Sequence, residues 1–379
     1  MTEGFIQRAV AIIDDRAVER NCARLAQELS GDALLCAVVK ANGYGHGAVE
    51  CARAALAGGA NWLAVAAAAE AAELRPHFPE TPILTMGALT APELDVALAA
   101  GADVAAWRPG FADVIAVRGA KLGMRPRVHV KHDSGMGRLG ERDPDTVLAL
   151  ASHVAADDRV ELAGLWTHFA TADEPDSAFF TEQLERFGGL AERVRAAHPD
   201  VLVHAANSAA TLRDPASHFD MVRCGIAIYG LDPFHSDPFA RRLEPALELT
   251  SYVADVKRFP RGTSAGYGRR WLAPADTWVG VLPVGYGDGV RRGLTNNGQA
   301  LVGGRRYPLV GTVSMDNVTI DLGAETNVET GSPAVLIGAQ GDDRVLCEEV
   351  ARRLDTINYE ITCGISARVP RIHVRRDAP

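Results

Sequence analysis

The chain has 379 residues and a mass of 40.3 kDa, and its composition of 47% hydrophobic and 23% charged residues is that of an ordinary globular protein. This length exceeds the usual size of a single core and predicts two domains, or a large barrel with a smaller unit. The net charge of −9 argues against a nucleic-acid partner, because neutralising phosphates requires a basic face.

The N-terminal segment does not resemble a targeting sequence. Residues 1–21 lack the long apolar stretch and the small-residue cleavage site of a signal peptide. No later stretch is apolar for long enough to span a bilayer, and the longest candidate, residues 62–69, is followed at once by Glu70. Six cysteines without a C-x-x-C pair indicate reduced thiols. We therefore expect a cytoplasmic protein without a membrane anchor.

The first two-thirds of the chain repeats a short apolar run, a loop and a helical segment. Strands that alternate with helices form parallel βαβ units, and eight units predict a closed (β/α)8 TIM-like barrel over residues 14–240. A doubly wound open sheet is the alternative, because the number of units does not prove closure. The predicted strands are residues 34–39, 62–66, 82–86, 103–107, 127–130, 162–166, 201–204 and 221–229, and the clearest helices are residues 48–56, 67–74, 92–99 and 179–197.

After about residue 238 the pattern changes, and residues 241–379 are predicted to form a mostly β C-terminal domain. Segments rich in Val, Thr, Ile and Leu are separated there by turns that contain Gly, Asp and Asn. Residues 9–13 fit a strand of either domain, and we assign residues 1–13 to the β-domain. The predicted strands are residues 247–257, 277–284, 299–302, 308–322 and 333–337, followed by a helix over residues 348–354.

The residue types that follow the barrel strands indicate the functional site, because the active face of such a barrel lies at the C-terminal strand ends. Lys40 closes the first apolar run and precedes a Gly-rich turn, where partial desolvation would make its amine a nucleophile for Schiff-base chemistry. Lys131 and Arg138 flank the fifth strand end and suit an anionic ligand. The last two strand ends carry small polar residues and glycine, which a phosphate site of a barrel requires: Asn207, Ser208 and Gly225.

Five histidines raise a metal site as an alternative. No strand end carries H-x-H, however, and His129 and His132 lie three residues apart on one strand, so that they point to opposite faces. We therefore predict no metal ligand.

The chain resembles the bacterial alanine racemases, which use pyridoxal 5'-phosphate (PLP). The stretch AVVKANGYGHGA (37–48) is similar to their PLP-lysine signature, and the resemblance continues in order to RVPRI (368–372). The motifs between them are VKHDSGMGRLG (130–140), GLWTHFATAD (164–173), HAANSAAT (204–211), FDMVRCGIAIYGLDP (219–233), LPVGYGDG (282–289), VGTVSMDNVTIDL (310–322) and TINYE (356–360).

The resemblance implies a role for each matching residue. Lys40 would carry PLP covalently and Tyr267 would be the opposite base, Arg223 would contact the pyridine nitrogen, and Lys131 would be carbamylated and orient Arg138. Cofactor contacts are implied for Tyr44, His168, Ser208, Gly225, Ile226 and Tyr359, and substrate contacts for Arg138, Met315, Asp316 and Tyr286. Tyr267, Tyr286, Met315 and Asp316 would come from the partner subunit of a head-to-tail homodimer.

The chemistry of racemisation agrees with two bases, because a proton leaves one face of Cα and returns on the other. An unperturbed phenol titrates near pH ~10, so Tyr267 would need His168 or a cation as a neighbour. The chain departs from the family pattern at Gly266, where Ser is common, at Ser134 for Thr and at Gly43 for Ala.

Four alternative functions differ from an alanine racemase. A broader racemase that takes serine shares the whole motif set. A PLP-dependent decarboxylase of ornithine/arginine type shares the barrel and the β-domain but has no need of two opposed bases. A non-catalytic PLP carrier resembles the barrel alone, and a metal-dependent barrel hydrolase is the most distant alternative. Tyr267 and the Met315-Asp316 pair favour the racemase. The sequence leaves open whether its metabolic role is the supply of D-alanine for the cell wall or amino-acid catabolism.

Overall fold

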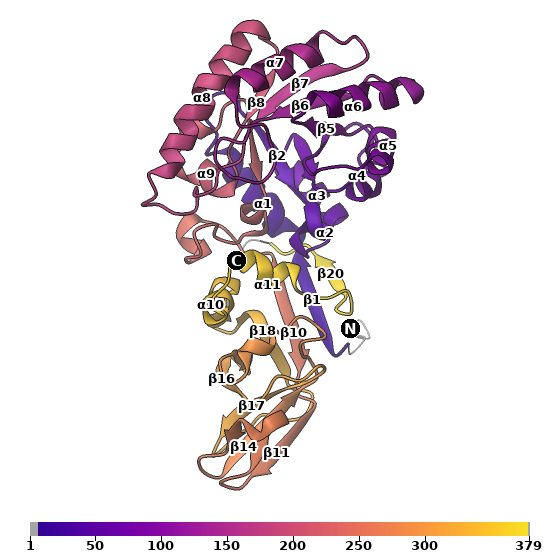
Figure 1. Cartoon of the computed structure of the whole chain (residues 1–379). Coiled ribbons are helices and arrows are strands. Elements are labelled where there is room, and N and C mark those ends of the chain that lie inside the picture. Colours follow the sequence, from indigo (N-terminus) through magenta and orange to yellow (C-terminus); the bar gives the residue numbers. More distant parts are fainter. Residues whose placement is uncertain (1–6, 378–379) are drawn as a thin grey trace. The chain divides into compact units, whose positions relative to one another are not determined.

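The computed structural model describes residues 7–377, which belong to two compact units (Figure 1). One unit spans residues 18–228, and the other joins residues 7–17 with residues 229–377. Residues 1–6, which the sequence analysis assigns to the β-domain, lie outside the described residues. The first unit is a closed parallel barrel surrounded by helices, and the second is built mainly from one large sheet. The predicted fold class, a (β/α)8 barrel followed by a mostly β domain, is confirmed.

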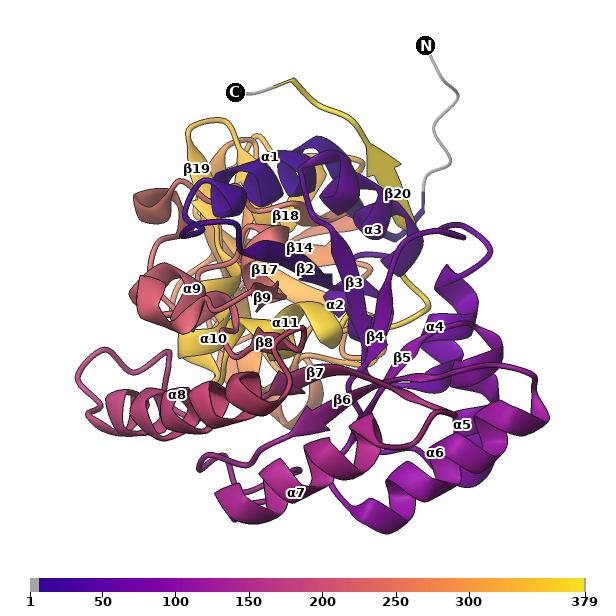
Figure 2. The same cartoon turned by 90° about the horizontal axis from the view of Figure 1, so that it is seen from above.

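Eight parallel strands form the barrel in chain order, and the last strand pairs with the first (Figure 2). Cys36 on the first strand lies opposite both Trp62 and Arg223, which shows the closure in register and excludes the open sheet. Most strand residues are buried, as expected for parallel strands covered on both faces. The strands are β2 (Leu34–Val38), β3 (Trp62–Val65), β4 (Ile83–Thr85), β5 (Asp103–Ala106), β6 (Arg127–Lys131), β7 (Glu161–Trp166), β8 (Leu202–His204) and β9 (Met221–Cys224).

Helices follow most strands and lie outside them in the view of Figure 2. Local signals start several of these helices: Asp143 precedes α7, and its carboxylate accepts a hydrogen bond of 2.9 Å from the Thr146 backbone amide. The helices are α1 (Asp15–Ala26), α3 (Ala48–Ala57), α4 (Ala68–Leu74), α5 (Ala91–Ala99), α6 (Pro109–Lys121), α7 (Pro144–Ala155), α8 (Phe179–Ala197) and α9 (Ser208–Arg213).

The segment directly after β2 is a left-handed turn, α2 (Lys40–Tyr44). Ala41, Asn42 and Tyr44 have φ values of 52°, 52° and 53°, and Gly43 has 62°. Left-handed backbone costs about 1–2 kcal/mol for each residue with a side chain, so Gly43 eases a strained turn. The turn is held by Asn42, whose side-chain oxygen accepts a hydrogen bond of 2.9 Å from the Ala48 amide.

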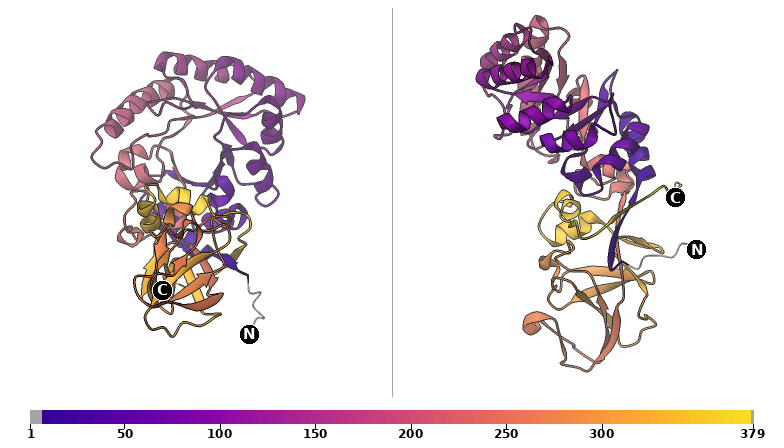
Figure 3. Two further views of the ribbon diagram at one scale, coloured as in Figure 1. Left: turned by 60° about the horizontal axis from the view of Figure 1, so that its bottom comes forward. Right: turned by 90° about the vertical axis from the view of Figure 1, so that its right-hand side faces the viewer.

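The second unit has the strand order β11-β14-β17-β16-β15-β18-β10-β1-β20, with β19 paired to β18. Figure 3 draws most of this unit's strands in orange and yellow. The N-terminal strand β1 (Ala9–Asp14) lies in this sheet, antiparallel to β10 and parallel to β20. The other elements are β10 (Leu247–Tyr252), β11 (Asp255–Phe259), β14 (Thr277–Leu282), β15 (Gln299–Val302), β16 (Arg305–Val310), β17 (Val318–Gly323), β18 (Pro333–Gln340), β19 (Asp343–Val345), β20 (Arg371–Val374), the separate hairpin β12 (Ser264–Ala265) and β13 (Trp271–Leu272), and the helices α10 (Cys347–Arg353) and α11 (Asn358–Cys363).

Three segments that were predicted as single strands are each divided in the structure. Residues 221–229 form β9 and a short 3₁₀ helix (Ile226–Tyr229). Residues 247–257 form β10 and β11, and residues 308–322 form β16 and β17 with a loop between them. Gly311 begins that loop with a φ of 77°, and the Ser314 amide donates a hydrogen bond of 3.0 Å to the Asn317 carbonyl. The loop carries Met315 and Asp316 out of the sheet.

Among the described residues, no helix is both long and apolar enough to cross a membrane.

Candidate active site

The cationic side chains predicted from the sequence gather at one end of the barrel. Lys131 ends β6 and is buried, with its Nζ 3.9 Å from the centre of the Trp166 ring. Burial and the positive charges of Arg223, Arg138 and Lys40 lower the pKa of Lys131 to about 7. The structure therefore brings these four groups close enough together to repel one another.

His168 lies within the same group of charges. Its pKa is well below the ordinary value because of burial, and the charges of Arg223, Lys131 and Arg138 lower it further. The imidazole is therefore neutral at pH 7. A neutral imidazole among several cations leaves the site with an excess of positive charge, which suits a ligand that carries negative charge.

Arg223 is buried beneath the site, and its guanidinium is held by acceptors on several sides. Nη2 donates to the carbonyls of Thr167 and Ala205, each at 2.8 Å, and lies 3.4 Å from His168 Nδ1. Nη1 lies 2.9 Å from His204 Nδ1. Burial lowers the pKa of Arg223 to about 10, which keeps the group charged at neutral pH.

A narrow cradle joins the ends of β8 and β9 to the turn after β2. The Ser208 hydroxyl oxygen accepts hydrogen bonds from the amides of Gly225 at 3.0 Å and Ala227 at 3.3 Å. A Cβ added at Gly225 would lie 2.3 Å from Tyr44 Oη, so glycine is required for the close approach. Tyr44, Ser208 and Gly225 thus lie close together, and Ile226 follows Gly225 in the chain.

Asn207 has a structural task at the same strand end. Its side-chain oxygen accepts a hydrogen bond of 2.9 Å from the Ala210 amide and caps α9. This bond orients the segment on which Ser208 lies.

The remaining predicted residues belong to the second unit, and three of them present large exposed side chains. Tyr267 is 73% exposed, Met315 50% and Tyr286 43%. Their loops are bonded together: the Tyr286 amide donates to the Ser314 carbonyl at 3.0 Å, and the Thr312 hydroxyl donates to the Tyr267 carbonyl at 2.6 Å. The three side chains form one exposed patch, which we call the tyrosine patch.

Gly266 holds the backbone beside Tyr267 in a conformation that other residues avoid. Its φ is 70° and its ψ −177°, and an added Cβ would lie 2.9 Å from the Thr312 amide nitrogen. Glycine at this position therefore has two structural reasons, the positive φ and the lack of room for a side chain.

Asp316 belongs to an ion-pair group that sequence reasoning missed. Arg368 donates to Asp316 at 2.7 Å and pairs with the buried Asp288 at 3.4 Å, and Arg8 pairs with Asp288 at 2.6 Å. The bond from Arg368 lowers the pKa of Asp316. The only sequence signal for this group is that Asp288 and Arg368 lie within the motifs LPVGYGDG and RVPRI.

Tyr359 lies on α11, next to a buried polar cluster. The side-chain nitrogen Nδ2 of Asn358 donates to the Glu348 carboxylate at 2.9 Å and to the Asp232 carbonyl at 2.8 Å. Burial raises the pKa of Glu348. These contacts fix the helix that carries Tyr359.

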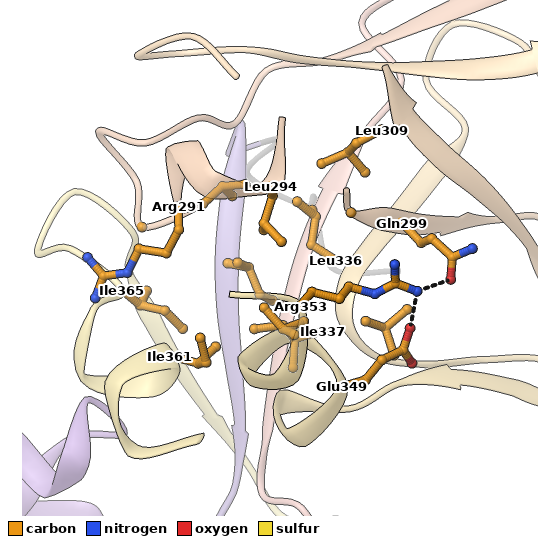
Figure 4. A pocket seen from close by; sticks show the side chains of 16 residues that line it. Arg291, Leu294, Gln299, Leu309, Leu336, Ile337, Glu349, Arg353, Ile361 and Ile365 are labelled. Carbon is orange, nitrogen blue, oxygen red and sulfur yellow. Dashed lines mark hydrogen bonds and ion pairs between the residues drawn. The ribbon is translucent and has the colours of Figure 1, made fainter. Parts of the chain in front are cut away.

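A small apolar cavity of about 30 Å³ lies in the second unit (Figure 4). Leucine and isoleucine side chains, among them Leu336 and Ile361, surround it, and Arg353 and Glu349 form an ion pair of 3.0 Å at its side. None of the predicted site residues lines this cavity, which has room for about one water molecule. Within residues 7–377, no group of three or more His, Cys, Asp or Glu side chains is arranged to hold a metal ion.

Comparisons with known proteins cover nearly the whole chain. Residues 13–233 match the alanine racemase N-terminal domain and residues 246–373 the alanine racemase C-terminal domain. The chain is 42% identical over 364 residues to the alanine racemase of Symbiobacterium thermophilum, with 96% of each chain covered. It is 40% identical over 379 residues to alanine racemase 1 of Bacillus subtilis, covering 98% of this chain and 94% of that one.

Solved structures give the same result. The alanine racemase of Streptomyces lavendulae is 35% identical and superposes with a TM-score of 0.92 over 97% of both chains. The alanine racemase of Bacillus anthracis with bound L-Ala-P is 36% identical, with a TM-score of 0.89 over 98% of this chain and 96% of that one.

Proposed function

The chain belongs to the alanine racemase family and is an isomerase that interconverts L- and D-alanine, and we propose that it does so with PLP and two opposed bases, Lys40 and Tyr267. The observation that carries the proposal is the group of cations around Lys40 at the C-terminal end of the barrel. A lysine amine among cations, together with the backbone amides and hydroxyl groups that meet at Ser208, Gly225 and Tyr44, suits a cofactor with an aldehyde and a phosphate.

The residues of the barrel fit PLP in three ways. Lys40 offers its amine for a Schiff base, and it lies near enough to Lys131 for its charge to lower the pKa of Lys131. The cradle of Tyr44, Ser208 and Gly225 would hold the phosphate. Arg138 would balance the remaining negative charge of cofactor and substrate, and its charge reaches Lys131. When bound, PLP withdraws electrons from the substrate Cα and makes its proton acidic.

Arg223 would face the pyridine nitrogen. Its guanidinium is charged and its direction is fixed by the Thr167 and Ala205 carbonyls. A permanent cation at that position disfavours a protonated ring nitrogen and so limits the electron withdrawal. The proton then returns to Cα rather than to another carbon, which favours racemisation over transamination.

Two side chains exchange the Cα proton from opposite faces. Nζ of Lys40 would hold the proton on one face and Oη of Tyr267 on the other, because a single base returns the proton to the face from which it came. The phenol of Tyr267 needs a nearby group that makes proton loss easier. His168 is neutral, since burial lowers its pKa, and its Nδ1 faces the donor Arg223, so its Nε2–H can donate a hydrogen bond to the phenolic oxygen and stabilise the phenolate.

A head-to-tail homodimer would complete the site. The tyrosine patch, formed by Tyr267, Met315 and Tyr286, exposes aromatic and apolar side chains on the second unit. The patch would cover the strand ends of the partner's barrel and supply Tyr267 to Lys40 of the other subunit. We also propose a cytoplasmic location, which six cysteines that form no disulfide among the described residues support.

Exchange of the α-proton with solvent deuterium tests the two-base assignment. We expect Tyr267→Phe to lose racemisation while it still exchanges the α-proton of one alanine enantiomer with retention. Exchange of both enantiomers with equal rates in Tyr267→Phe would contradict the assignment. Lys40→Ala is expected to lose covalent cofactor attachment, seen as loss of the borohydride-reducible visible band. Serine measured alongside alanine defines the substrate range.

Dilution tests the dimer. Specific activity should fall as the enzyme is diluted below its dimer dissociation constant, and sedimentation should show the dimer dissociating over the same concentrations. Full activity of a sedimenting monomer would contradict a shared site.

A further inference from the structure

A chain of hydrogen bonds crosses the interior of the barrel and ends on Arg223. Asp103 Oδ2 lies 2.9 Å from His129 Nε2, and His129 Nδ1 lies 2.9 Å from His204 Nε2. His204 Nδ1 in turn lies 2.9 Å from Arg223 Nη1. Asp103 is the first residue of β5 and His204 the last residue of β8, so the chain runs from the N-terminal to the C-terminal end of the barrel.

The two ends of this chain determine the position of every proton in it. Arg223 only donates, so His204 Nδ1 must accept, and the His204 proton lies on Nε2. That proton is donated to His129 Nδ1, which places the His129 proton on Nε2. A carboxylate only accepts, so Asp103 receives the last bond. Both imidazoles are therefore neutral and in the Nε2–H tautomer.

The surroundings keep the two rings in place and dry. His129 and His204 have no exposed surface, and Trp166 stacks on His204 with an angle of 6° between the rings. β7 lies between the strands of the two histidines, and its Gly164 leaves the space that their contact needs. A Cβ at Gly164 would lie 2.2 Å from His129 Nδ1. Burial and the Arg223 charge lower the pKa of His204, which agrees with a neutral ring.

We propose that Asp103 is a positioning residue for Arg223, because its carboxylate fixes the tautomers of His129 and His204 and so keeps an acceptor in front of the guanidinium. Without that acceptor at Asp103, His129 could carry its proton on Nδ1. His204 would then turn its own proton toward Arg223, and two donors would face each other. The inference rests on the proposed contact between Arg223 and the pyridine nitrogen for its catalytic consequence, but not for the tautomers.

The second contact of Asp103 provides a matched control. Arg127 Nε lies 3.1 Å from the same oxygen, Oδ2, that faces His129. In Asp103→Asn, His129 Nε2 and Arg127 Nε would still donate to one oxygen. We therefore expect the side-chain amide of the new asparagine to turn its oxygen, and not its nitrogen, toward these two donors. Asp103→Ala removes the acceptor. Arg127→Leu removes the other donor and leaves the acceptor for His129 intact.

The tautomers are measured in holoenzyme labelled with 15N-histidine, by long-range proton–nitrogen correlation, with the signals assigned through single histidine substitutions. We expect Nε2–H in both rings of the wild type, of Asp103→Asn and of Arg127→Leu. In Asp103→Ala we expect His129 to populate Nδ1–H. We also expect more transamination per turnover and a fall in kcat of about tenfold, the factor that corresponds to one unsatisfied buried hydrogen bond.

Three results would overturn the inference. One is an Nδ1–H tautomer or an imidazolium at either ring of the wild type, which needs no variant to fold. The second is Asp103→Ala with wild-type tautomers, cofactor absorbance and transamination. The third is Asp103→Asn behaving as Asp103→Ala. A further result would separate this inference from the proposed function. If the tautomers are as expected but Arg223→Lys leaves cofactor absorbance and transamination unchanged, Asp103 still fixes the two tautomers. The proposed contact between Arg223 and the pyridine nitrogen is then wrong.

Discussion

Gly225 lies so close to Tyr44 that a Cβ at position 225 would come within 2.3 Å of the phenolic oxygen. The Gly225 amide also donates to the Ser208 hydroxyl at 3.0 Å. One glycine therefore joins the turn after β2 to the ends of β8 and β9, and these are the segments that we propose to hold the cofactor phosphate.

Gly225→Ala should weaken PLP binding about tenfold or more, because the added methyl group must displace Tyr44 or open the cradle. The dissociation constant is measured by titrating apoenzyme with PLP and following the absorbance. Gly188→Ala on α8 is the matched control, since no atom lies within 4 Å of an added Cβ there. An unchanged PLP affinity in Gly225→Ala would show that this cradle does not bind the phosphate of PLP.

Gly266→Ala should lower the free energy of unfolding by about 1–3 kcal/mol, because a side chain is strained at this φ and ψ. The added Cβ also meets the Thr312 backbone, so we expect Tyr267 to shift and kcat to fall. Denaturant unfolding and steady-state kinetics measure the two effects. Gly262→Ala provides the control, with a φ of 83° but open space around the Cβ. Equal kcat in both variants would show that contact of the added Cβ with Thr312 does not affect catalysis.

Lys131 should form a carbamate with carbon dioxide. A pKa of about 7 leaves about half of its amine neutral at pH 7, and only the neutral amine reacts. The reactive fraction decreases as the pH falls below 7 and increases above it. With 13C-bicarbonate, we expect a carbamate carbon signal that is absent from Lys131→Met and that weakens on acidification below pH 7. A spectrum without that signal in the wild type would contradict the prediction.

Arg223→Glu should increase the transamination side reaction, because an acidic partner favours a protonated pyridine nitrogen and stronger electron withdrawal. Conversion of the cofactor to its amine form is followed by absorbance during turnover with alanine. Arg223→Gln is a comparison that removes the charge without supplying an acid. If transamination in Arg223→Glu equals that of the wild type, the charge at position 223 does not control the partition.

The sequence predicted much of the fold and many residues of the site. Apolar runs and helical periodicity depend on local burial, so the eight strands and most helices could be placed from the chain alone. Because the C-terminal ends of the strands of a barrel lie at one face, Lys40, Lys131 and Arg223 could be expected to be neighbours. The individual roles of these residues came from the ordered family motifs.

Tertiary structure decided what depends on contacts between distant segments. It placed β1 in the second unit's sheet, because β1 pairs with β10 and β20. It also joined Asp103 to His129 and Asp288 to Arg368, pairs whose spacing along the chain carries no signal. The sequence alone determined which residue types stand at the strand ends and in the motifs, because periodicity and motifs depend on residues that are close together along the chain. Tautomers, close approaches such as that of Gly225 to Tyr44, and buried ion pairs arise only when the barrel closes and the sheet is assembled.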